Sequence, residues 1–548
     1  MQHEYTYDVS MFRDTFETRF TYLNGFLRNV SRFGTRPALH DPLSGRRWTY
    51  RELNAEANRL AHALRADGVG KNDVVMFALL NSPEFVFCYL AAHKIGAIAC
   101  PVNYRQGAGE IALVIDDSRP KAFFYDAEFG ELSGSALQLC EHKPQTVVMV
   151  DYKGGAAAPA GHKRYQDYVS MQPETDPPID FDPHIYDETT RLYTSGTTNR
   201  PKGVPINNVN EVLSAHDVMM HFPLGPLDRT MNMTPWFHRG GIHSGGPCPT
   251  LYAGGEVVIL RDFAPKRALE YAEKYQISFL IGVPTIIAML ARTQERTPAD
   301  LSALRGIVTM GAPFEKAACE KYMHLLTPNI FNGYGTTETF WNTFLRPFDL
   351  PEMAGSAGRS CTDDDVRLVA IHEDGTHAEP DETVPRDSET PGEIIISSPA
   401  KSAFCYYNNE EMTKAKFYKG WLYTGDVGTW DENEFVTVSG RKDDMIVSAG
   451  ENIYPTQIEA VLNEHPKVAE SAVIGVPDKL RGEVVAAYVI PSDDSLTVDD
   501  LKGYCTHHPM LSSYKWPREY HIVSELPHTA TGKLMHYKLR QQQKNREE

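Results

Sequence analysis

The sequence lacks the features of several protein classes. Its eight cysteines form no C-x-x-C pair, so neither a zinc site nor a disulfide framework is predicted. No apolar run approaches the ~20 residues that span a bilayer. Basic residues are the minority: the formal net charge is −18, which argues against a nucleic acid or an anionic membrane as the main partner. Because neither a signal peptide nor a peroxisomal address is recognisable, we expect a cytoplasmic protein.

What is present is ordinary globular material in an alternating pattern. The chain has 548 residues, of which 42% are hydrophobic, so more than one domain is expected. A helix is predicted from residue 50 to 66 with Thr49 as its N-cap. A buried strand at 74–80, a helix at 83–95 and a strand at 98–102 follow. We expect this rhythm to continue to about residue 440, which predicts an α/β fold of layered sheets and helices.

The first chemical stretch is YTSGTTNRPKG, residues 193–203. Hydroxyls and a glycine let backbone N–H groups approach a phosphate chain, and Lys202 adds a positive charge. The residues concerned are Thr194, Ser195, Gly196, Thr197 and Thr198. The spacing matches neither a P-loop nor a dinucleotide fingerprint. It predicts a phosphate-binding loop between two strands; a polar surface loop is the alternative.

Two further stretches suggest a nucleotide site. In NGYGTTE, Gly333 and Gly335 flank the aromatic ring of Tyr334, and Glu338 offers a hard oxygen ligand suited to Mg²⁺. An exposed turn is the alternative here. In YTGD, Asp426 follows a turn glycine and could accept hydrogen bonds from vicinal hydroxyls. Near the C-terminus, Lys533 follows a Thr-Gly pair and could swing into a site, although most lysines near a C-terminus only improve solubility.

Together these stretches resemble the adenylate-forming superfamily of acyl-CoA synthetases, luciferases and peptide-synthetase adenylation domains. Four motifs stand in the family's order between residues 193 and 533, and the resemblance covers nearly the whole chain. One departure is Asn199, where the family usually has glycine. The resemblance implies a large N-terminal domain, residues 1–442, which holds the ATP and acyl pockets. It also implies a small mobile α+β domain, residues 443–548, which carries a catalytic lysine.

The same resemblance assigns roles to individual residues. By this resemblance, Tyr334 stacks on adenine and Thr337 contacts a phosphate. Glu338 and Thr194 bind Mg²⁺, and Lys533 bridges the substrate carboxylate and the α-phosphate. The implied nucleotide-binding residues, besides the phosphate loop, are Gly311, Ala312, Pro313, Asn332, Gly333, Tyr334, Gly335, Thr337, Asp426 and Arg441. Asp443 falls on the hinge position, and Ser448, Ala449 and Gly450 fall on the coenzyme A channel.

The acyl pocket is less readable. The segment WFHRGG matches the family's aromatic segment beside the acyl site, and it contains no aspartate that could pair with a substrate ammonium, which disfavours an α-amino acid. His238 could gate the carboxylate end of the pocket or be a structural histidine. Arg239 is compatible with a substrate that has a second polar group. The predicted lining is Trp236, His238, Gly240, Gly241, Val283, Met310 and Trp341. It favours a compact apolar acid: alicyclic, aromatic or of short to medium chain.

We therefore predict an AMP-forming carboxylate:CoA ligase that uses ATP, Mg²⁺ and coenzyme A. The carboxylate attacks the α-phosphate of ATP, and a domain rotation then lets the thiol reach the acyl-adenylate. The alternatives are an enzyme that loads a carrier protein, a luciferase-like oxygenase and an inactive nucleotide-binding scaffold. Small molecules are the expected partners, with neither nucleic acid nor membrane insertion, and a homodimer is possible.

Overall fold

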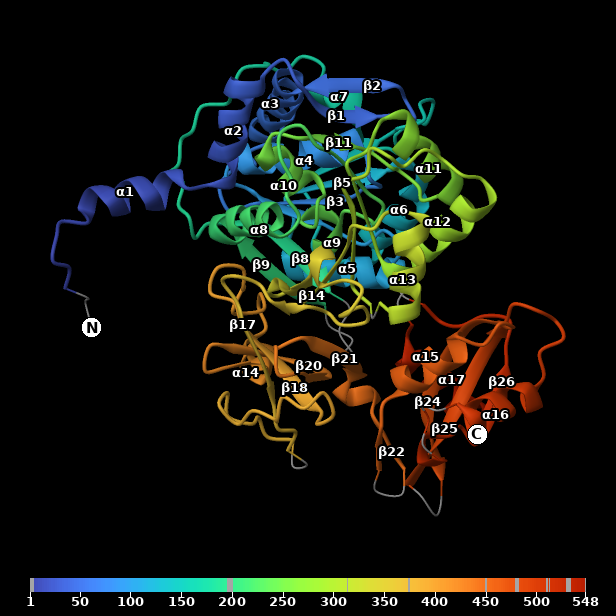
Figure 1. The fold of residues 1–548 in the computed structure, drawn as a ribbon. Helices are drawn as coiled ribbons and strands as arrows, with labels where there is room; N and C mark the ends of the chain where they lie inside the picture. Colours follow the sequence, from blue (N-terminus) through green and yellow to red (C-terminus); the bar gives the residue numbers. More distant parts are fainter. Residues whose placement is uncertain are drawn as a thin grey trace.

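A computed structural model describes residues 4–194, 201–312, 314–372, 375–448, 451–478, 482–508, 511, 513–528 and 534–547. Over these residues the chain forms four sheets with helices packed against them (Figure 1). The helices of the larger part are α1 (Ser10–Arg19), α2 (Tyr22–Phe33), α3 (Tyr50–Ala66), α4 (Pro83–Lys94), α5 (Ala108–Ser118), α6 (Gly130–Leu139), α7 (Tyr165–Val169), α8 (Asn208–His221), α9 (Arg239–Ile242), α10 (Pro247–Ala253), α11 (Pro265–Lys274), α12 (Pro284–Arg296), α13 (Lys316–Leu325) and α14 (Glu410–Lys416).

The first sheet has seven strands in the order β7-β6-β5-β3-β4-β8-β9. Their bounds are β3 (Val74–Ala78), β4 (Ile98–Pro101), β5 (Ala122–Asp126), β6 (Thr146–Val150), β7 (Lys163–Arg164), β8 (Glu188–Thr194) and β9 (Lys202–Asn207). Side chains of β3 alternate between two cores: Val75 and Phe77 pack with α4, and Met76 packs with α5. Helices therefore cover both faces, as a buried parallel sheet requires. The predicted N-cap of α3 is confirmed, because Thr49 and Glu52 form a capping box.

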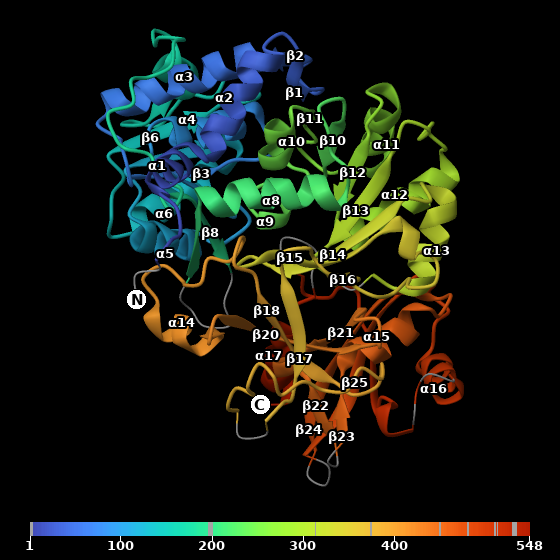
Figure 2. The ribbon, with the colours of Figure 1, turned by 60° about the vertical axis from the view of Figure 1, so that its left-hand side comes forward.

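The second sheet has nine strands in the order β16-β15-β14-β13-β12-β10-β11-β1-β2. Their bounds are β1 (Pro37–Asp41), β2 (Arg46–Thr49), β10 (Arg229–Asn232), β11 (Glu256–Val258), β12 (Phe279–Gly282), β13 (Gly306–Met310), β14 (Ile330–Thr336), β15 (Phe340–Leu345) and β16 (Arg359–Ser360). Helix α8 runs between the two sheets (Figure 2). Its Val212 belongs to the core of the first sheet and its Val218 to a core with β12.

The expected alternation of strands and helices does not reach residue 440. From β14 onward the larger part is antiparallel, because β14 pairs with β15 and β15 with β16. A third, five-stranded sheet follows: β17 (Asp365–Val369), β18 (Gly392–Ser397), β19 (Phe417–Tyr418), β20 (Trp421–Trp430) and β21 (Val436–Arg441). Within these described residues α14 is the one α-helix, and it has seven residues. Apolar runs such as GEIIIS in β18 suit parallel and antiparallel strands alike, so the expectation was wrong here.

The C-terminal part has its own sheet and cores. Its strands are β22 (Ile446–Ser448), β23 (Glu451–Ile453), β24 (Val468–Asp478), β25 (Gly482–Pro491) and β26 (Glu519–Ile522), and its helices are α15 (Pro455–Asn463), α16 (Val498–His507) and α17 (His536–Glu547). One core joins β24 and β25 to α15 and α16, and a second joins them to α17. The fold is thus α/β, with a large N-terminal domain and a smaller α+β C-terminal domain, as predicted. Among the helices described, none combines the length and apolarity needed to cross a membrane.

Candidate active site

The predicted phosphate loop leaves and re-enters the first sheet at its edge. Strands β8 and β9 are antiparallel, and their last Cα pair joins Thr194 to Lys202, so the loop does lie between two strands. The stem is anchored because the Tyr193 hydroxyl donates to Oδ2 of Asp117 at 2.6 Å. Ser195, Gly196, Thr197 and Thr198 lie outside the described residues. The end of β8 and the ends of β13 and β14 are C-terminal strand ends, where open α/β sheets bind ligands.

The predicted adenine wall lies where β13 and β14 end. Gly311 and Ala312 follow β13 directly, and Pro313 is outside the described residues. Gly311 has a φ of +84°, a conformation that favours glycine. A Cβ on Gly335 would lie 1.6 Å from the carbonyl oxygen of Phe340, so this glycine is required by the close approach of β15. The Asn332 side chain is directed elsewhere, since its amide donates to the Ser356 carbonyl at 3.2 Å.

Tyr334, Asp426 and Arg441 meet although they come from three strands. The Tyr334 hydroxyl donates to Oδ2 of Asp426 at 2.8 Å, and Nε of Arg441 lies 2.8 Å from Oδ1. Asp426 and Arg441 are register partners on β20 and β21. Burial, followed by the Asp426 carboxylate, raises the pKa of Tyr334 well above its ordinary value, so the phenol stays protonated. No sequence pattern indicates the hydrogen bond between Tyr334 and Asp426, which fixes the carboxylate beside the ring.

Glu338 sits in the turn between β14 and β15 and is tied to a segment that the motif analysis missed. The Tyr406 hydroxyl donates to its Oε1, and the Ala403 N–H donates to its backbone carbonyl at 3.0 Å. Burial and then the Glu338 carboxylate raise the pKa of Tyr406. The Glu338 carboxylate is half-buried at a turn, and it offers a hard oxygen ligand of the kind that fits Mg²⁺.

A cavity of about 190 Å³ extends from this wall to residues of α9 and β15. Most of the predicted acyl residues line it: His238, Gly240, Gly241, Val283, Met310 and Trp341, together with Gly311, Ala312, Gly333, Gly335 and Thr337. The lining also includes Thr234, Arg239, Ser244, Thr285, Thr336 and Phe340. Of these, only Arg239 and Thr336 stand within the motif segments, so no sequence pattern indicated the other four.

The prediction that Trp236 lines the acyl pocket is wrong, because this residue is not part of the cavity lining. The ring is fully buried in the core of the first sheet and packs edge-on against Phe85, with ring centroids 5.6 Å apart. The next residue, Phe237, belongs to the core on the opposite side of that sheet. The two aromatic side chains therefore fill two cores, and the segment first reaches the cavity at His238.

His238 and Arg239 bring polar groups to the buried cavity wall. Burial, with a smaller contribution from Arg105, lowers the pKa of His238 to about 4, so its imidazole is neutral near pH 7. Burial lowers the pKa of Arg239 to about 10, which leaves its guanidinium charged. Two backbone carbonyls accept hydrogen bonds from that guanidinium, those of Thr337 and Lys401.

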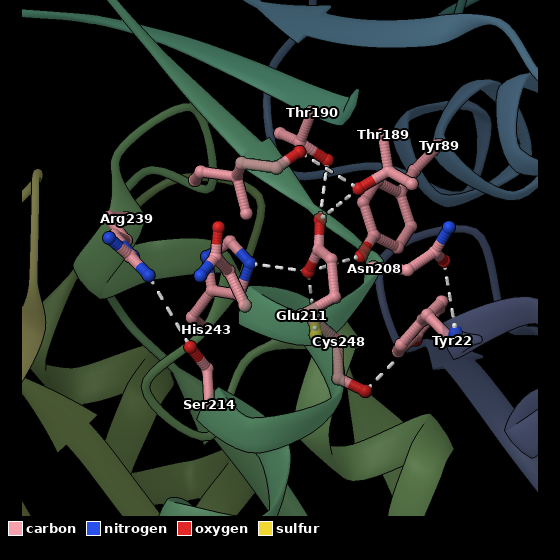
Figure 3. Close-up of polar contacts among 12 residues, drawn as sticks. Tyr22, Tyr89, Thr189, Thr190, Asn208, Glu211, Ser214, Arg239, His243 and Cys248 are labelled. Carbon is pink, nitrogen blue, oxygen red and sulfur yellow. Dashed lines mark hydrogen bonds and ion pairs between the residues drawn. The ribbon is translucent and has the colours of Figure 1, made fainter. Parts of the chain in front are cut away.

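A buried hydrogen-bond network lies behind the cavity and is centred on Glu211 of α8 (Figure 3). The carboxylate lies 2.6 Å from Nε2 of His243, and it accepts hydrogen bonds from the hydroxyls of Tyr89 at 3.0 Å and Thr190 at 2.6 Å. Burial opposes its ionisation, but His243 and the hydroxyl donors hold the pKa of Glu211 below its ordinary value. The network connects α8, β8 and α4 beneath the site.

The predicted hinge region is partly described. Asp443 lies in the short 3₁₀ turn Lys442–Asp444 that separates β21 from β22. In the same turn, Oδ1 of Asp444 lies 2.6 Å from the Arg540 guanidinium of α17. Ser448 is buried at the end of β22. Ala449, Gly450 and Lys533 lie outside the described residues.

Comparisons with known proteins agree with this architecture. A family model described as AMP-binding enzyme matches residues 26–407, and one described as AMP-binding enzyme C-terminal domain matches residues 457–533. An indoleacetate–CoA ligase of Aromatoleum aromaticum is 32% identical over 90% of this chain and 92% of its own length. A fatty acid–[acyl-carrier-protein] ligase of Streptomyces coeruleorubidus is 30% identical, over 92% and 94% respectively.

Among solved structures, that of the anthranilate CoA ligase AuaEII in complex with anthranoyl-AMP has a TM-score of 0.87 to this chain. It is 27% identical in sequence and covers 97% of this chain and 98% of its own. Two family models together match most of the sequence, and the solved structure matches both domains. The chain therefore belongs to the AMP-binding enzymes, the adenylate-forming family that its motifs resemble.

Proposed function

We propose that the protein is an AMP-forming carboxylate:CoA ligase that activates a compact carboxylic acid. The observation that carries this is one continuous cavity, which is lined both by the threonines and glycines beside Tyr334 and by Gly240, Met310 and Trp341. A nucleotide's α-phosphate at Thr337 and an acid beside Gly240 and Trp341 would meet there. The whole cavity, with the nucleotide wall included, has a volume of about 190 Å³. An engineered cavity of roughly 150 Å³ binds benzene, so an acid with at most one ring is the expected size.

The first step forms an acyl-adenylate. The acid's carboxylate oxygen attacks the α-phosphorus of ATP, the bond to the pyrophosphate oxygen breaks, and pyrophosphate leaves. Negative charge gathers on the phosphoryl oxygens, so cations and N–H donors lower the barrier. We assign this role to Lys202, the phosphate loop and Lys533. Mg²⁺, which Glu338 and Thr194 would hold, supplies further positive charge to the phosphates.

The nucleotide is held by groups whose positions are fixed. The Tyr334 ring offers a stacking face, and its hydroxyl bond to Asp426 fixes the carboxylate that would accept from the ribose hydroxyls. Arg441 supports the same carboxylate from the other side. His238 is neutral near pH 7, so it adds no positive charge at the carboxylate end of the cavity, where it would act as a gate or a hydrogen-bonding group.

The second step transfers the acyl group to coenzyme A. The thiol sulfur attacks the carbonyl carbon of the acyl-adenylate, and AMP leaves with the electron pair of the broken C–O bond. We propose that residues 443–548 rotate about Asp443 between the two steps, so that Lys533 withdraws and the thiol enters past Ser448, Ala449 and Gly450. Support comes from the change of sheet between β21 and β22, with a short turn as the connection.

Carrier-protein loading is the second candidate, because one relative named above is an acyl-carrier-protein ligase. Both candidates perform the first step, so the test must separate the acceptors. Purified protein is incubated with ATP, Mg²⁺ and a panel of one-ring and short-chain acids, and AMP release is measured with and without coenzyme A. We expect release that coenzyme A stimulates at least tenfold. Release that only a carrier protein stimulates would favour the second candidate, and no acid-dependent pyrophosphate exchange would contradict both. A homodimer remains a prediction.

A further inference from the structure

A buried lysine outside the sequence motifs contacts two parts of the cavity wall. Lys401 follows β18 and is 1% exposed. Its Nζ donates to the backbone carbonyl of Trp341 at 2.6 Å. Its own backbone carbonyl accepts from the Arg239 guanidinium at 3.0 Å. Trp341 of β15 and Arg239 of α9 both line the cavity, so one residue holds two wall residues that are far apart in the sequence.

The position of the Lys401 ammonium group is fixed by two carboxylates. Nζ lies 2.9 Å from Oδ2 of Asp217 on α8 and 2.7 Å from Oδ2 of Asp364. An ammonium group has three N–H donors, so together with the Trp341 carbonyl each donor has an acceptor. Lysine is almost never fully buried unless it is paired, and the two aspartates supply the pairing. Because Nζ cannot turn away, the carbonyl that it binds is fixed as well.

The aspartates are held by further groups behind the wall. Oδ1 of Asp217 lies 3.0 Å from Nε2 of His221, and Oδ2 of Asp364 accepts from the Asn342 amide at 3.0 Å. Neither the two aspartates nor Lys401 is part of the cavity lining. The cluster can therefore act on a bound acid only through the two wall residues that Lys401 holds.

The backbone around the lysine is anchored to α8. The Asn210 amide donates to the carbonyls of Ala400 and Ser402 at 3.0 and 3.2 Å, which fixes the chain on both sides of the lysine. The next residue binds the nucleotide end, because the Ala403 N–H donates to the Glu338 carbonyl at 3.0 Å. The nucleotide end thus has its own contact with this segment, which does not involve the lysine side chain.

Stability alone is a weak reason for such a cluster. Buried ion pairs are often no more stabilising than apolar residues of the same volume. Given the ligase function proposed above, we propose that Lys401 is a positioning residue for the acid, which sets where Trp341 stands at the acyl end. Without the ammonium group the Trp341 carbonyl loses its donor and this part of the wall can shift. The acid then fits less well, whereas the nucleotide end keeps its contacts.

The first test replaces the lysine by an uncharged side chain of similar length. Lys401→Met in the full chain is assayed by acid-dependent exchange of pyrophosphate into ATP, with benzoate, cyclohexanecarboxylate and hexanoate as the acids. For the acid with the highest wild-type kcat/KM, we expect the KM to rise at least tenfold and the KM for ATP to stay within twofold. A purely structural role would lower the fraction of active protein, and therefore kcat, and would leave both KM values unchanged.

A second variant separates the fit of the acid from stability. Lys401→Met leaves the Asp364 carboxylate buried without its cation, so we expect a lower melting temperature. Combining it with Asp364→Asn removes that unpaired charge and should recover part of the loss. The KM for the acid should stay raised in the double variant, because the Trp341 carbonyl still lacks its donor. A KM that recovers together with the melting temperature would overturn the inference.

The matched control is another buried lysine. Lys94 at the end of α4 is 2% exposed and lies 2.8 Å from Asp176, and neither residue lines the cavity. Lys94→Met should lower the melting temperature and leave the KM values for the acid and for ATP unchanged. If it raises the KM for the acid as much as Lys401→Met does, the effect comes from lost stability and the inference is overturned.

The outcomes separate this inference from the function on which it rests. No exchange by the wild-type protein with any of the acids would overturn the ligase function, and the inference with it. Wild-type exchange together with an unchanged acid KM in both Lys401 variants would overturn the inference and leave the ligase function intact. A double variant that does not fold would also overturn it, because the fold itself would then require the lysine.

Discussion

The two ends of the one cavity are built by different means. At the nucleotide end, side chains at strand ends and turns bond to one another, as Tyr334 does to Asp426 and Tyr406 does to Glu338. At the acyl end, glycines and large apolar side chains such as Met310 and Trp341 line most of the space. Phosphate binding restricts which residue types can stand at the nucleotide end. At the acyl end, the residues are determined by the shape of the acid that binds there. The predictions below test whether the two ends can be changed independently.

The largest effect should come from the lysine that is proposed to bridge the acid's carboxylate and the α-phosphate. Lys533→Ala is expected to lower the rate of acyl-adenylate formation by roughly 10²–10³-fold, the usual loss when one group that stabilises developing charge is removed. Thioester formation from supplied acyl-adenylate should keep its wild-type rate within about threefold, because the thiol step does not need this cation. Pyrophosphate exchange and thioester formation are measured separately.

The matched control is Lys538→Ala, an exposed lysine of α17 in the same domain. It should leave both half-reactions unchanged. If Lys533→Ala slows both steps equally, the lysine is needed for something other than adenylation, and the proposed withdrawal of the C-terminal domain loses its basis.

Glu338→Gln should have the next largest effect. The amide keeps the shape of the side chain but removes the anionic oxygen that would hold Mg²⁺. We expect kcat/KM for adenylation to fall about 100-fold and the Mg²⁺ concentration for half-maximal rate to rise. Tyr406→Phe removes only the hydroxyl that donates to this carboxylate and should cost only a few-fold. An unchanged Mg²⁺ dependence in Glu338→Gln would show that the metal is held elsewhere.

The nucleotide end could be predicted from the sequence because its residue types are constrained locally. A turn glycine such as Gly311 must take a positive φ, and Gly335 has no room for a Cβ beside Phe340. Such constraints leave short patterns that can be read along the chain. The loop between Thr194 and Lys202 could be predicted for the same reason, and the two residues are paired at the ends of strands β8 and β9.

The acyl end could not be predicted so well, because its geometry depends on contacts between distant segments. Arg239 is held by carbonyls 98 and 162 residues away, which no local pattern records. The resemblance of WFHRGG to the family's aromatic segment predicts Trp236 in the pocket, but the side chains of Trp236 and Phe237 enter two different cores. The antiparallel arrangement after β14 was missed because apolar runs do not reveal strand direction.

A smaller effect is expected when the pH is lowered, and it tests whether water reaches His238 at the acyl end. The pKa of His238 is lowered to about 4 by burial, whereas an unfolded histidine titrates near 6.5. The unfolded state therefore binds the proton first, so this residue's contribution to stability falls as the pH drops from about 6.5 to about 4. The loss between pH 7 and pH 5 should be on the order of 1–2 kcal/mol. Urea unfolding of wild type and His238→Gln at both pH values measures it.

In that experiment the variant should lose less stability than the wild type on going to pH 5. His507→Gln, which changes an exposed histidine of α16, is the matched control and should behave like the wild type. Equal losses in all three proteins would mean that His238 is hydrated, and the acyl end would then be as wet as the nucleotide end.

The smallest effect should come from narrowing the acyl end by one methyl group. A Cβ on Gly240 would lie 3.2 Å from Sδ of Met310, the far part of a flexible side chain that can shift slightly. Gly240→Ala should therefore fold, lower kcat/KM for one-ring acids about three- to tenfold, and leave the KM for ATP within twofold. Gly241→Ala is the contrasting variant, because its Cβ would lie 2.0 Å from the Pro235 carbonyl oxygen and the backbone would have to move. We expect that variant to lose stability measurably in thermal unfolding. If Gly240→Ala instead raised the KM for ATP as strongly as that for the acid, the two ends of the cavity would not be independent.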